Sequence, residues 1–272
     1  MNTNKITYEN YVAHKKEFGH VSTWALWNEE AKDIRSNAEK DAAIRRELII
    51  ANSREEFEDK RLGKLLHGDL VVLALNFSCP KRTKANDHPV IHLLNEYKDE
   101  KHNRIRYESL KELVEEQEEF TFFNMYAPAA RYYAEGFMKS NLLHGAYMTD
   151  FIKFVEEDGE LLPAGIPDSN SGSDIVSQCL RQDRIHIQAE GLKKEFDLLG
   201  IQPKVILTVS SRLNSKRVQA AISDALGYQP RFERLYHYTP RGTPYAPKYD
   251  SYEALYKDQI RQVHQAIESV AF

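Results

Sequence analysis

Residues 68–78 read Gly68-Asp69-Leu70-Val71-Val72-Leu73-Ala74-Leu75-Asn76-Phe77-Ser78, a short apolar run that ends in an amide, an aromatic ring and a hydroxyl. An apolar run this short predicts a strand that is buried on both faces of a sheet. In open α/β sheets, ligands bind just beyond the carboxyl ends of the strands. Asn76 is therefore the first candidate for a functional residue in this chain.

The composition is that of a globular protein with a sizeable core, since 42% of the 272 residues are hydrophobic. The net charge of −4 argues against a protein that coats nucleic acid non-specifically. Residues 204–248 nevertheless carry eight bases and two acids. Two interpretations of this basic segment stay open, an ordinary solvated surface and a rim that faces phosphates.

The two cysteines, Cys79 and Cys179, lie far apart and form no CxxC pair. Their number predicts neither a disulfide framework nor a zinc site, and it excludes a cluster held by four thiolates of one chain. We find no signal-like apolar segment at the N-terminus and no run long enough to span a bilayer. We therefore expect a cytoplasmic protein with no membrane partner.

Predicted strands alternate with predicted helices along the chain. The strands cover residues 69–75, 145–153, 203–210 and 232–237. The helices cover 28–66 (one long or two shorter), 88–97, 107–118, 129–138, 173–199, 215–226 and 251–269; residues 120–127 are either strand or buried loop, and 158–173 form a loop. This order predicts an α/β fold, a three-layer αβα arrangement with a central, mostly parallel four-stranded sheet, plus N-terminal helices. We expect residues 1–66 to form a helical extension packed on a main domain of residues 67–272, the two making one structural unit.

The carboxyl ends of parallel strands open on one edge of the sheet, and this edge gathers most of the candidate site residues. They are Asn76, Phe77, Ser78, Thr149, Asp150, Lys153, Ser210, Ser211, Arg212 and His237. Such amides, hydroxyls, rings and a histidine can orient a water molecule, stack a planar ligand and stabilise a developing anion. No phosphate-binding glycine loop and no GxSxG turn follows a strand, so the sequence does not indicate a nucleotide triphosphatase, a dinucleotide enzyme or an α/β-hydrolase. His88 and His92 have helical spacing but no third ligand in view, so we predict no metal site.

Three of these segments, in this order, resemble the motifs of the uracil-DNA glycosylase superfamily. Leu75-Asn76-Phe77-Ser78 is similar to the first motif, in which Asp or Asn ends the first strand. Gly145-Ala146-Tyr147-Met148-Thr149-Asp150-Phe151-Ile152-Lys153 is similar to the second-strand motif, and His237-Tyr238-Thr239-Pro240 to the final His-Pro-Ser-Pro motif. The resemblance covers about residues 69–245, and the segment 203–210 falls where the family has its third strand.

The resemblance implies a role for each matching position. Asn76 would hold the water that attacks the sugar C1′ of a flipped nucleotide, and His237 would stabilise negative charge on the departing base. Base binding would fall to Phe77, Ser78, Tyr147, Thr149 and Asp150. Contact with DNA phosphates, or insertion of a loop into the duplex, would fall to Lys153, Ser210, Ser211, Arg212, Tyr238, Thr239 and Arg241. The resemblance implies no cofactor and DNA as the partner.

Several positions depart from the family pattern. Asn76 stands where many members have Asp, so it can orient a water but not act as a base. Ala74 replaces a glycine, and Tyr238 replaces a proline. Asp150 replaces the Asn that reads the base, and an ionised carboxylate only accepts hydrogen bonds, so it would prefer an edge rich in donors to that of uracil.

Two functions stay open from the sequence. The first is a divergent DNA-base glycosylase that hydrolyses the N-glycosidic bond of a damaged or deaminated base, or binds such a base. The second is a non-catalytic module on the same fold that binds a nucleobase, another small planar ligand or a partner protein. Structural roles also stay open, with Asn76 capping a loop, Asp150 pairing with Lys153, and His237 packing as a buried histidine.

Overall fold

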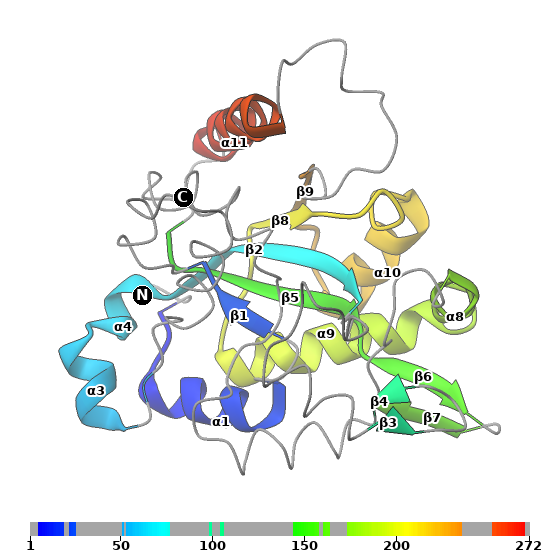
Figure 1. Ribbon diagram of the computed structural model, residues 1–272, viewed down its shortest axis with the longest axis horizontal. Coiled ribbons are helices and arrows are strands. Elements are labelled where there is room, and N and C mark those ends of the chain that lie inside the picture. The colour runs from blue at the N-terminus through cyan, green and yellow to red at the C-terminus, as the bar shows by residue number, and fades with distance from the viewer. Residues whose placement is uncertain are drawn as a thin grey trace, which may run out of the picture.

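The computed structural model describes residues 5–18, 22–25, 51, 53–76, 98–99, 104–105, 144–157, 160–163, 173–235 and 252–269 (Figure 1). Its main feature is a five-stranded sheet in the order β1-β5-β2-β8-β9. The strands are β1 (Ser22–Trp24), β5 (Ala146–Ile152), β2 (His67–Asn76), β8 (Val205–Thr208) and β9 (Arg231–Arg234). Neighbours among β5, β2, β8 and β9 run parallel, and β1 pairs antiparallel with β5 at the edge. The predicted α/β fold with a mostly parallel four-stranded sheet is confirmed, and β1 is an addition that we did not predict.

The central strands are buried on both faces, as their continuous apolar sequences predict. Every residue of β5 is buried, and Leu70 to Leu73 of β2 are at most 1% exposed. Side chains alternate between the two faces of a strand. Since consecutive residues are all buried, each face of the sheet is covered.

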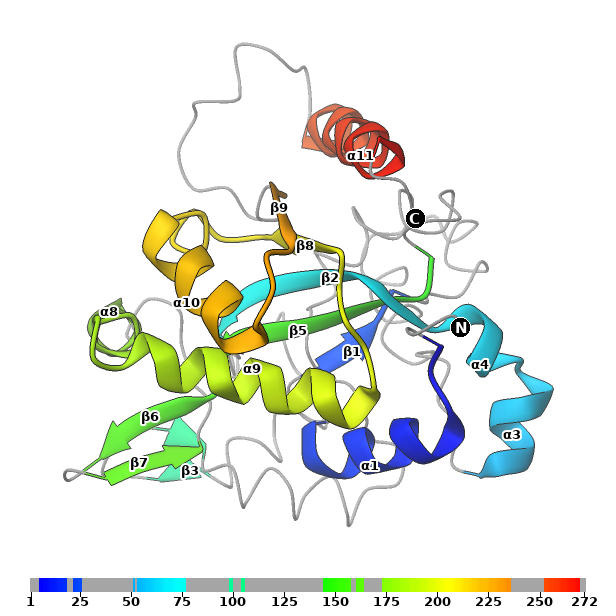
Figure 2. The same ribbon diagram turned by 180° about the vertical axis from the view of Figure 1, so that it is seen from behind.

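Helices lie on both sides of the sheet in the two opposite views (Figure 1, Figure 2). On one side, α1 (Tyr8–Phe18) and α10 (Lys216–Leu226) both pack against α9 (Ile185–Leu199), which contacts β5. On the other side lies α11 (Tyr252–Glu268), in which Val263 and Ile267 are buried. The apolar residues of α9 recur on one face and join the core, which lets the helix cover the sheet.

The predicted helix ends in the C-terminal half agree with the structure. Ser215 caps α10 by accepting a hydrogen bond from the Val218 amide. Gly200 and Gly227 end α9 and α10 at φ angles of 67° and 74°, which favour glycine. The predicted helix 173–199 is wrong in one respect, because it is broken into α8 (Ser173–Cys179) and α9 by a turn at residues 180–184. The break falls on the polar run Arg181-Gln182-Asp183-Arg184, which offers no apolar side chain to the sheet.

Two short hairpins stand beside the main sheet. They pair β6 (Phe154–Glu157) with β7 (Glu160–Pro163), and β3 (Lys98–Asp99) with β4 (Arg104–Ile105). The predicted loop over 158–173 is therefore wrong at residues 160–163, where β7 pairs with β6. Leu161 and Leu162 supply the apolar residues of that strand. The predicted helices 88–97, 107–118 and 129–138 and the ambiguous segment 120–127 lie outside the described residues.

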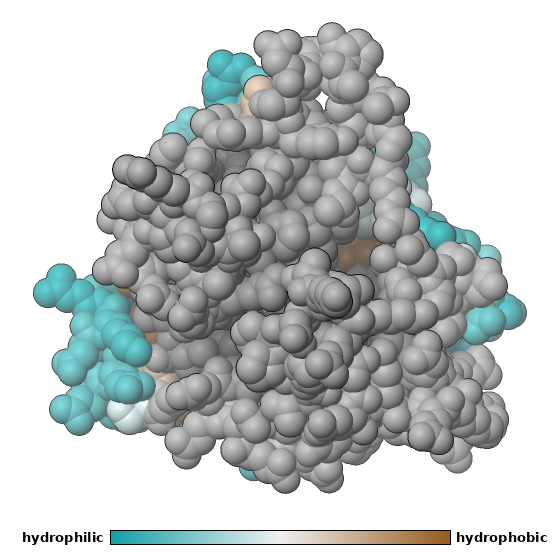
Figure 3. All heavy atoms as spheres, viewed as in Figure 1, coloured by the Kyte–Doolittle hydropathy of each residue, from teal (hydrophilic) through white to brown (hydrophobic). Residues whose placement is uncertain are grey.

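The N-terminal segment is built into the fold. Of the helix predicted over 28–66, the described part contains α3 (Arg54–Asp59), capped by Ser53, and α4 (Leu62–Leu65). Within the expected helical extension, residues 22–24 form the strand β1, which joins the sheet. In Figure 3, hydrophilic side chains cover the rim where α3 and α4 lie, in keeping with the exposed charges of Arg54, Glu55 and Glu58. Among the described residues, no helix has the length and hydropathy needed to cross a membrane.

Candidate functional site

The carboxyl ends of β2, β5, β8 and β9 lie at one edge of the sheet, because these strands run parallel. Asn76 is the last residue of β2, and its backbone is in register with Ile152 of β5. Two residues earlier, Ala74 is in register with Asp150. Two predicted segments, the end of β2 and the second-strand motif, are therefore neighbours at this edge. The side chain of Asn76 and the residues Phe77, Ser78, His237, Tyr238, Thr239 and Arg241 lie outside the described part of the structure.

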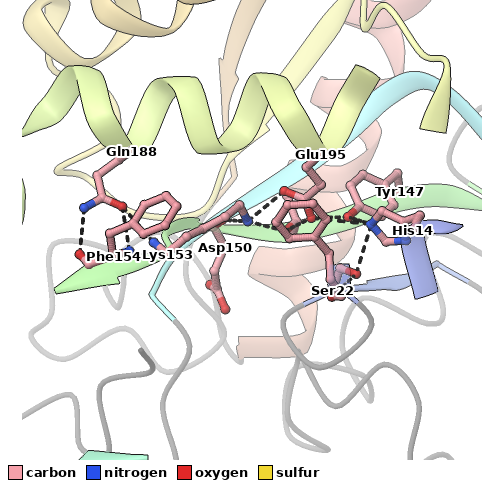
Figure 4. A network of polar contacts seen from close by, with 10 residues as sticks. His14, Ser22, Tyr147, Asp150, Lys153, Phe154, Gln188 and Glu195 are labelled. Carbon is pink, nitrogen blue, oxygen red and sulfur yellow. Dashed lines mark hydrogen bonds and ion pairs between the residues drawn. The ribbon is translucent and has the colours of Figure 1, made fainter. Parts of the chain in front are cut away.

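The strand β5 divides its polar side chains between the two faces of the sheet. Tyr147 and Thr149 both donate to Glu195 of α9. The carboxylate of Asp150 points away from α9, to the opposite face (Figure 4). All three side chains are buried, and Asp150 is 1% exposed. Of the residues that the resemblance grouped as base-binding, the three that the structure describes are thus divided by the sheet, with Asp150 on the face away from α9.

Glu195 of α9 is the centre of a buried polar network on the first face (Figure 4). Its Oε1 accepts a short hydrogen bond from the Tyr147 hydroxyl and another from Thr149 Oγ1 at 2.7 Å. Its Oε2 lies 2.7 Å from Lys153 Nζ. Since both partners of this ion pair are at most 1% exposed, water screens the charges little. Together these contacts join α9 to β5 and to the residue that follows it.

The pKa of Glu195 reflects a competition between burial and its partners. Burial alone would raise the pKa of this carboxyl group. The positive charge of Lys153, whose Nζ lies 2.7 Å from Oε2, outweighs burial and lowers the pKa of Glu195 to about 2. Burial, followed by the charge of Glu195, raises the pKa of the Tyr147 hydroxyl well above its usual value. Glu195 is therefore the ionised acceptor, and Tyr147 is a neutral donor.

His14 of α1 extends the network to the N-terminal segment. Its Nε2 lies 2.5 Å from the Tyr147 hydroxyl oxygen and 3.6 Å from Glu195 Oε1. Burial lowers the pKa of His14, although Glu195 acts in the opposite direction. Because the Tyr147 proton is directed to Glu195, a neutral His14 donates its Nε2 proton to the tyrosine oxygen. Ser22 of β1 completes the group, with its Oγ 3.5 Å from His14 Nε2 and donating to the Phe18 carbonyl at 2.8 Å.

Gln188 of α9 binds the backbone where the chain leaves the sheet. Its Oε1 accepts hydrogen bonds from the amides of Lys153 at 2.8 Å and Phe154 at 3.0 Å. Its Nε2 donates to the Phe154 carbonyl at 2.7 Å. The side-chain amide thus serves these backbone groups in place of a neighbouring strand.

The structure changes the interpretation of Lys153. We predicted that this lysine contacts a DNA phosphate, but its ammonium is buried and binds Glu195, Thr149 and the Asp150 carbonyl. An ammonium has three protons, and these three acceptors use them all. In this arrangement Lys153 is a core residue, and the predicted phosphate contact is wrong. The alternative pairing of Lys153 with the Asp150 side chain also gives way to the pair with Glu195.

The loop after β8 lies at the same edge and has its own internal contacts. Thr208 donates to Asn214 Oδ1 at 2.7 Å, and the Asn214 side-chain amide donates to the Ser210 carbonyl at 3.0 Å. The guanidinium of Arg212 donates to Ser177 Oγ of α8 at 3.1 Å. Ser211 and Arg212 are exposed and Ser210 is partly exposed, so all three are accessible from solvent at the edge.

His14, Gln188 and Glu195 were not predicted from the sequence. One signal was available, because Gln188 and Glu195 are polar residues seven positions apart, on the face of α9 that also presents Leu192 and Leu199 to the core. Gly191 lies between them, and a Cβ atom there would be 2.8 Å from the Phe154 ring. No comparable signal marks His14. No group of three potential metal ligands occurs among the residues that the structure describes, and His88 and His92 are outside them.

In comparisons with known proteins, no family model, no curated protein and no solved structure matches this chain.

Proposed function

We propose that this protein binds a damaged or deaminated base at the carboxyl edge of its sheet and hydrolyses the N-glycosidic bond of that base in DNA. The observation that carries the proposal is the adjacency of Asn76 and Asp150. These residues stand near the carboxyl ends of neighbouring parallel strands, and a buried carboxylate is in register with the residue two before Asn76. The motif resemblance supports the same pair. The two widely separated cysteines favour a reducing, cytoplasmic setting for the reaction.

The proposed reaction needs no cofactor. A water held by Asn76 adds to the sugar C1′, the bond from C1′ to the base nitrogen breaks, and the base leaves with the electron pair. His237 stabilises the negative charge on the base until the base takes up the proton that the added water loses, and an abasic site with a hydroxyl on C1′ remains. Asp150 accepts hydrogen bonds from the base edge, so bases that present donors there are the preferred substrates.

Abasic-site formation tests the proposal directly. Single- and double-stranded oligonucleotides with uracil, hypoxanthine or xanthine are incubated with the protein, and abasic sites are then cleaved with alkali. We expect cleavage of at least one substrate and a loss of about 10²-fold or more in Asn76→Ala, the usual scale for a group that positions a reacting proton or water. Gln262→Ala, on the exposed face of α11, is the control and should keep wild-type activity. If no substrate yields abasic sites, the hydrolytic function is wrong.

The second candidate is a non-catalytic pocket for a free nucleobase or another small planar ligand. The replacement of the base-reading Asn by Asp150 favours it, since this change alters the edge that the pocket accepts. Calorimetric titration with free bases tests this function. Binding of a free base that Asn76→Ala abolishes, without abasic sites in any oligonucleotide, would support the second candidate over the first.

A further inference from the structure

The two residues that follow β5, Lys153 and Phe154, are held by Gln188 of α9. The strand ends at Ile152, and β6 begins at Phe154 in a separate hairpin. At this change of direction, Gln188 accepts from two successive amides and donates to one carbonyl. Gln188 is 1% exposed, so no water replaces these bonds at low cost.

Lys153 ties the backbone of Asp150 to the same helix. Its ammonium donates to the Asp150 carbonyl at 2.6 Å and to Thr149 Oγ1 at 3.0 Å, and it lies 2.7 Å from Glu195 Oε2. The Lys153 side chain therefore folds back along the end of β5 and links Thr149 and the Asp150 carbonyl to Glu195 on α9. The Asp150 backbone pairs with Ala74 of β2 and is also tied to α9 through Lys153 and Glu195. Gln188 fixes the chain just after it.

Stability alone does not account for this polar set. Well-packed apolar residues often replace a buried ion pair with no loss of stability, because both charges must be desolvated. What the ion pair and the glutamine do supply is a single backbone geometry, since their hydrogen bonds are directional. The carboxylate of Asp150 projects from this fixed backbone to the opposite face of the sheet (Figure 4).

We infer that Gln188 and Glu195 are positioning residues, which hold the backbone of residues 150–154 so that the Asp150 carboxylate has a fixed place at the carboxyl edge. They act through the protein and do not touch the base. This inference rests on the proposed function, because it assigns Asp150 to the base-binding site. A displacement of about 1 Å in a positioning group costs up to about 10²-fold in rate.

The main test replaces Gln188 by the near-isosteric Met and uses Gln262→Met on α11 as the matched control. In Gln188→Met, the amides of Lys153 and Phe154 should exchange with solvent about tenfold to hundredfold faster, because each loses its acceptor. The amides of β5 that bind β2 should exchange as in the wild type. The ¹³C shift of the Asp150 carboxyl carbon should move beyond the difference between the wild type and Gln262→Met.

The kinetic test separates positioning from general destabilisation. We expect kcat of Gln188→Met to fall about tenfold per folded molecule with KM changed much less, since the base edge is still available but is misaligned. If the amides lose protection while kcat and the Asp150 shift stay as in the wild type, Gln188 is merely structural and the inference is wrong. If the amides keep their protection, the inference is also wrong.

A second pair of variants covers the case in which Gln188→Met fails to fold. Thr149→Val removes one partner of Lys153 and Glu195 without a change in shape, and Thr208→Val removes a hydroxyl that is equally buried on β8. The Asp150 carboxyl shift should move in Thr149→Val and not in Thr208→Val. If the wild type makes no abasic sites, the proposed hydrolytic function is wrong. The exchange rates and the Asp150 shift still decide whether α9 positions Asp150.

Discussion

At the scale of single residues, the buried network predicts how stability depends on pH. The pKa of His14 is lowered from 6.5 by burial, so the folded protein holds this histidine neutral where the unfolded chain protonates it. The unfolded state then binds more protons, and stability falls as the pH decreases from about 6.5. Glu195 causes a second loss of stability at lower pH, because its pKa is about 2 in the folded protein and 4.5 for the unperturbed group. This loss begins near pH 4.5 and continues to about pH 2, and it is on the order of 3 kcal/mol.

Urea unfolding at pH 7.5, 5.5 and 4.5 measures the contribution of His14. We expect His14→Gln to lose less stability between pH 7.5 and 5.5 than the wild type, because the variant lacks the group that the unfolded chain protonates in this range. His186→Gln is the control, since His186 is an exposed histidine on α9. An equal pH dependence in the wild type and His14→Gln would show that His14 is not held neutral.

The residues of the network show which contacts cannot be predicted from the sequence. Tyr147 and Thr149 lie on β5 and Lys153 directly follows it, and their motif indicated this part of the chain. Their partners come from distant parts of the sequence: His14 is 133 positions from Tyr147, and Glu195 is 48 positions from it. No spacing rule connects such positions, since tertiary packing alone brings them together. Lys153 was therefore predicted to contact a DNA phosphate. Its actual partner is Glu195, because tertiary packing places α9 beside β5.

At the scale of elements, the surroundings of two glycines predict different losses of stability when each glycine is replaced by alanine. Gly145 leads into β5 at a φ of 82°, and a Cβ there would lie 1.9 Å from the Leu65 carbonyl oxygen. Gly227 ends α10 at a φ of 74° and has no atom within 4 Å of the same position. Gly227→Ala should thus cost about 1–2 kcal/mol for the left-handed backbone alone. Gly145→Ala should cost at least about 3 kcal/mol, because the backbone must also move.

Chemical unfolding of both variants at one pH checks this difference. The Gly227 variant serves as the control for the backbone term, and the excess in Gly145→Ala measures the contact between α4 and the entry to β5. Equal losses in the two variants would mean that Leu65 does not approach Gly145 in solution.

The elements that could be predicted are those with strong local signals. The apolar runs of β2, β5 and β8, and the glycine stops of α9 and α10, are sufficient to locate these elements within a few residues. The strand β1 has only three residues, Ser22-Thr23-Trp24, and depends on its pairing with β5. The hairpin strand β7 was likewise hidden in a segment rich in Pro and Gly. Short edge strands owe their existence to a neighbour, which the local sequence does not specify.

At the scale of the whole molecule, the topology explains why the position of the candidate site could be predicted although the directions of its side chains could not. Four parallel strands must place their carboxyl ends at one edge, so Asn76, Asp150 and the loop after β8 had to converge on it. The sheet also has two faces, and predicting a single edge does not tell which face each side chain occupies. The assignment of Thr149 to the α9 face and Asp150 to the other follows from strand alternation, once the neighbour of each face is known.

A basic surface at this edge is made of Arg181 and Arg212, in the turns after α8 and β8, and of Lys216 and Arg217 at the start of α10. All four residues are exposed. Arg212 binds Ser177 of α8, and Arg217 donates to the Leu180 carbonyl at 2.7 Å, so two separate segments contribute to one surface. If DNA is the partner, phosphates should contact this surface and release counterions.

Salt-dependent retention of DNA tests the basic surface with a charge-matched control. Each phosphate contact contributes about −0.9 to the slope of log affinity against log salt concentration. The double variant Arg212→Glu/Lys216→Glu should therefore bind DNA more weakly and lose about two units of slope. Lys60→Glu/Lys64→Glu makes the same change in net charge at α3 and α4, which lie at the other end of the molecule (Figure 1), and should keep the wild-type slope. An equal loss in both double variants would mean that net charge, and not this surface, governs retention. Free-base binding without any DNA retention at low salt would favour the small-ligand function over the glycosylase.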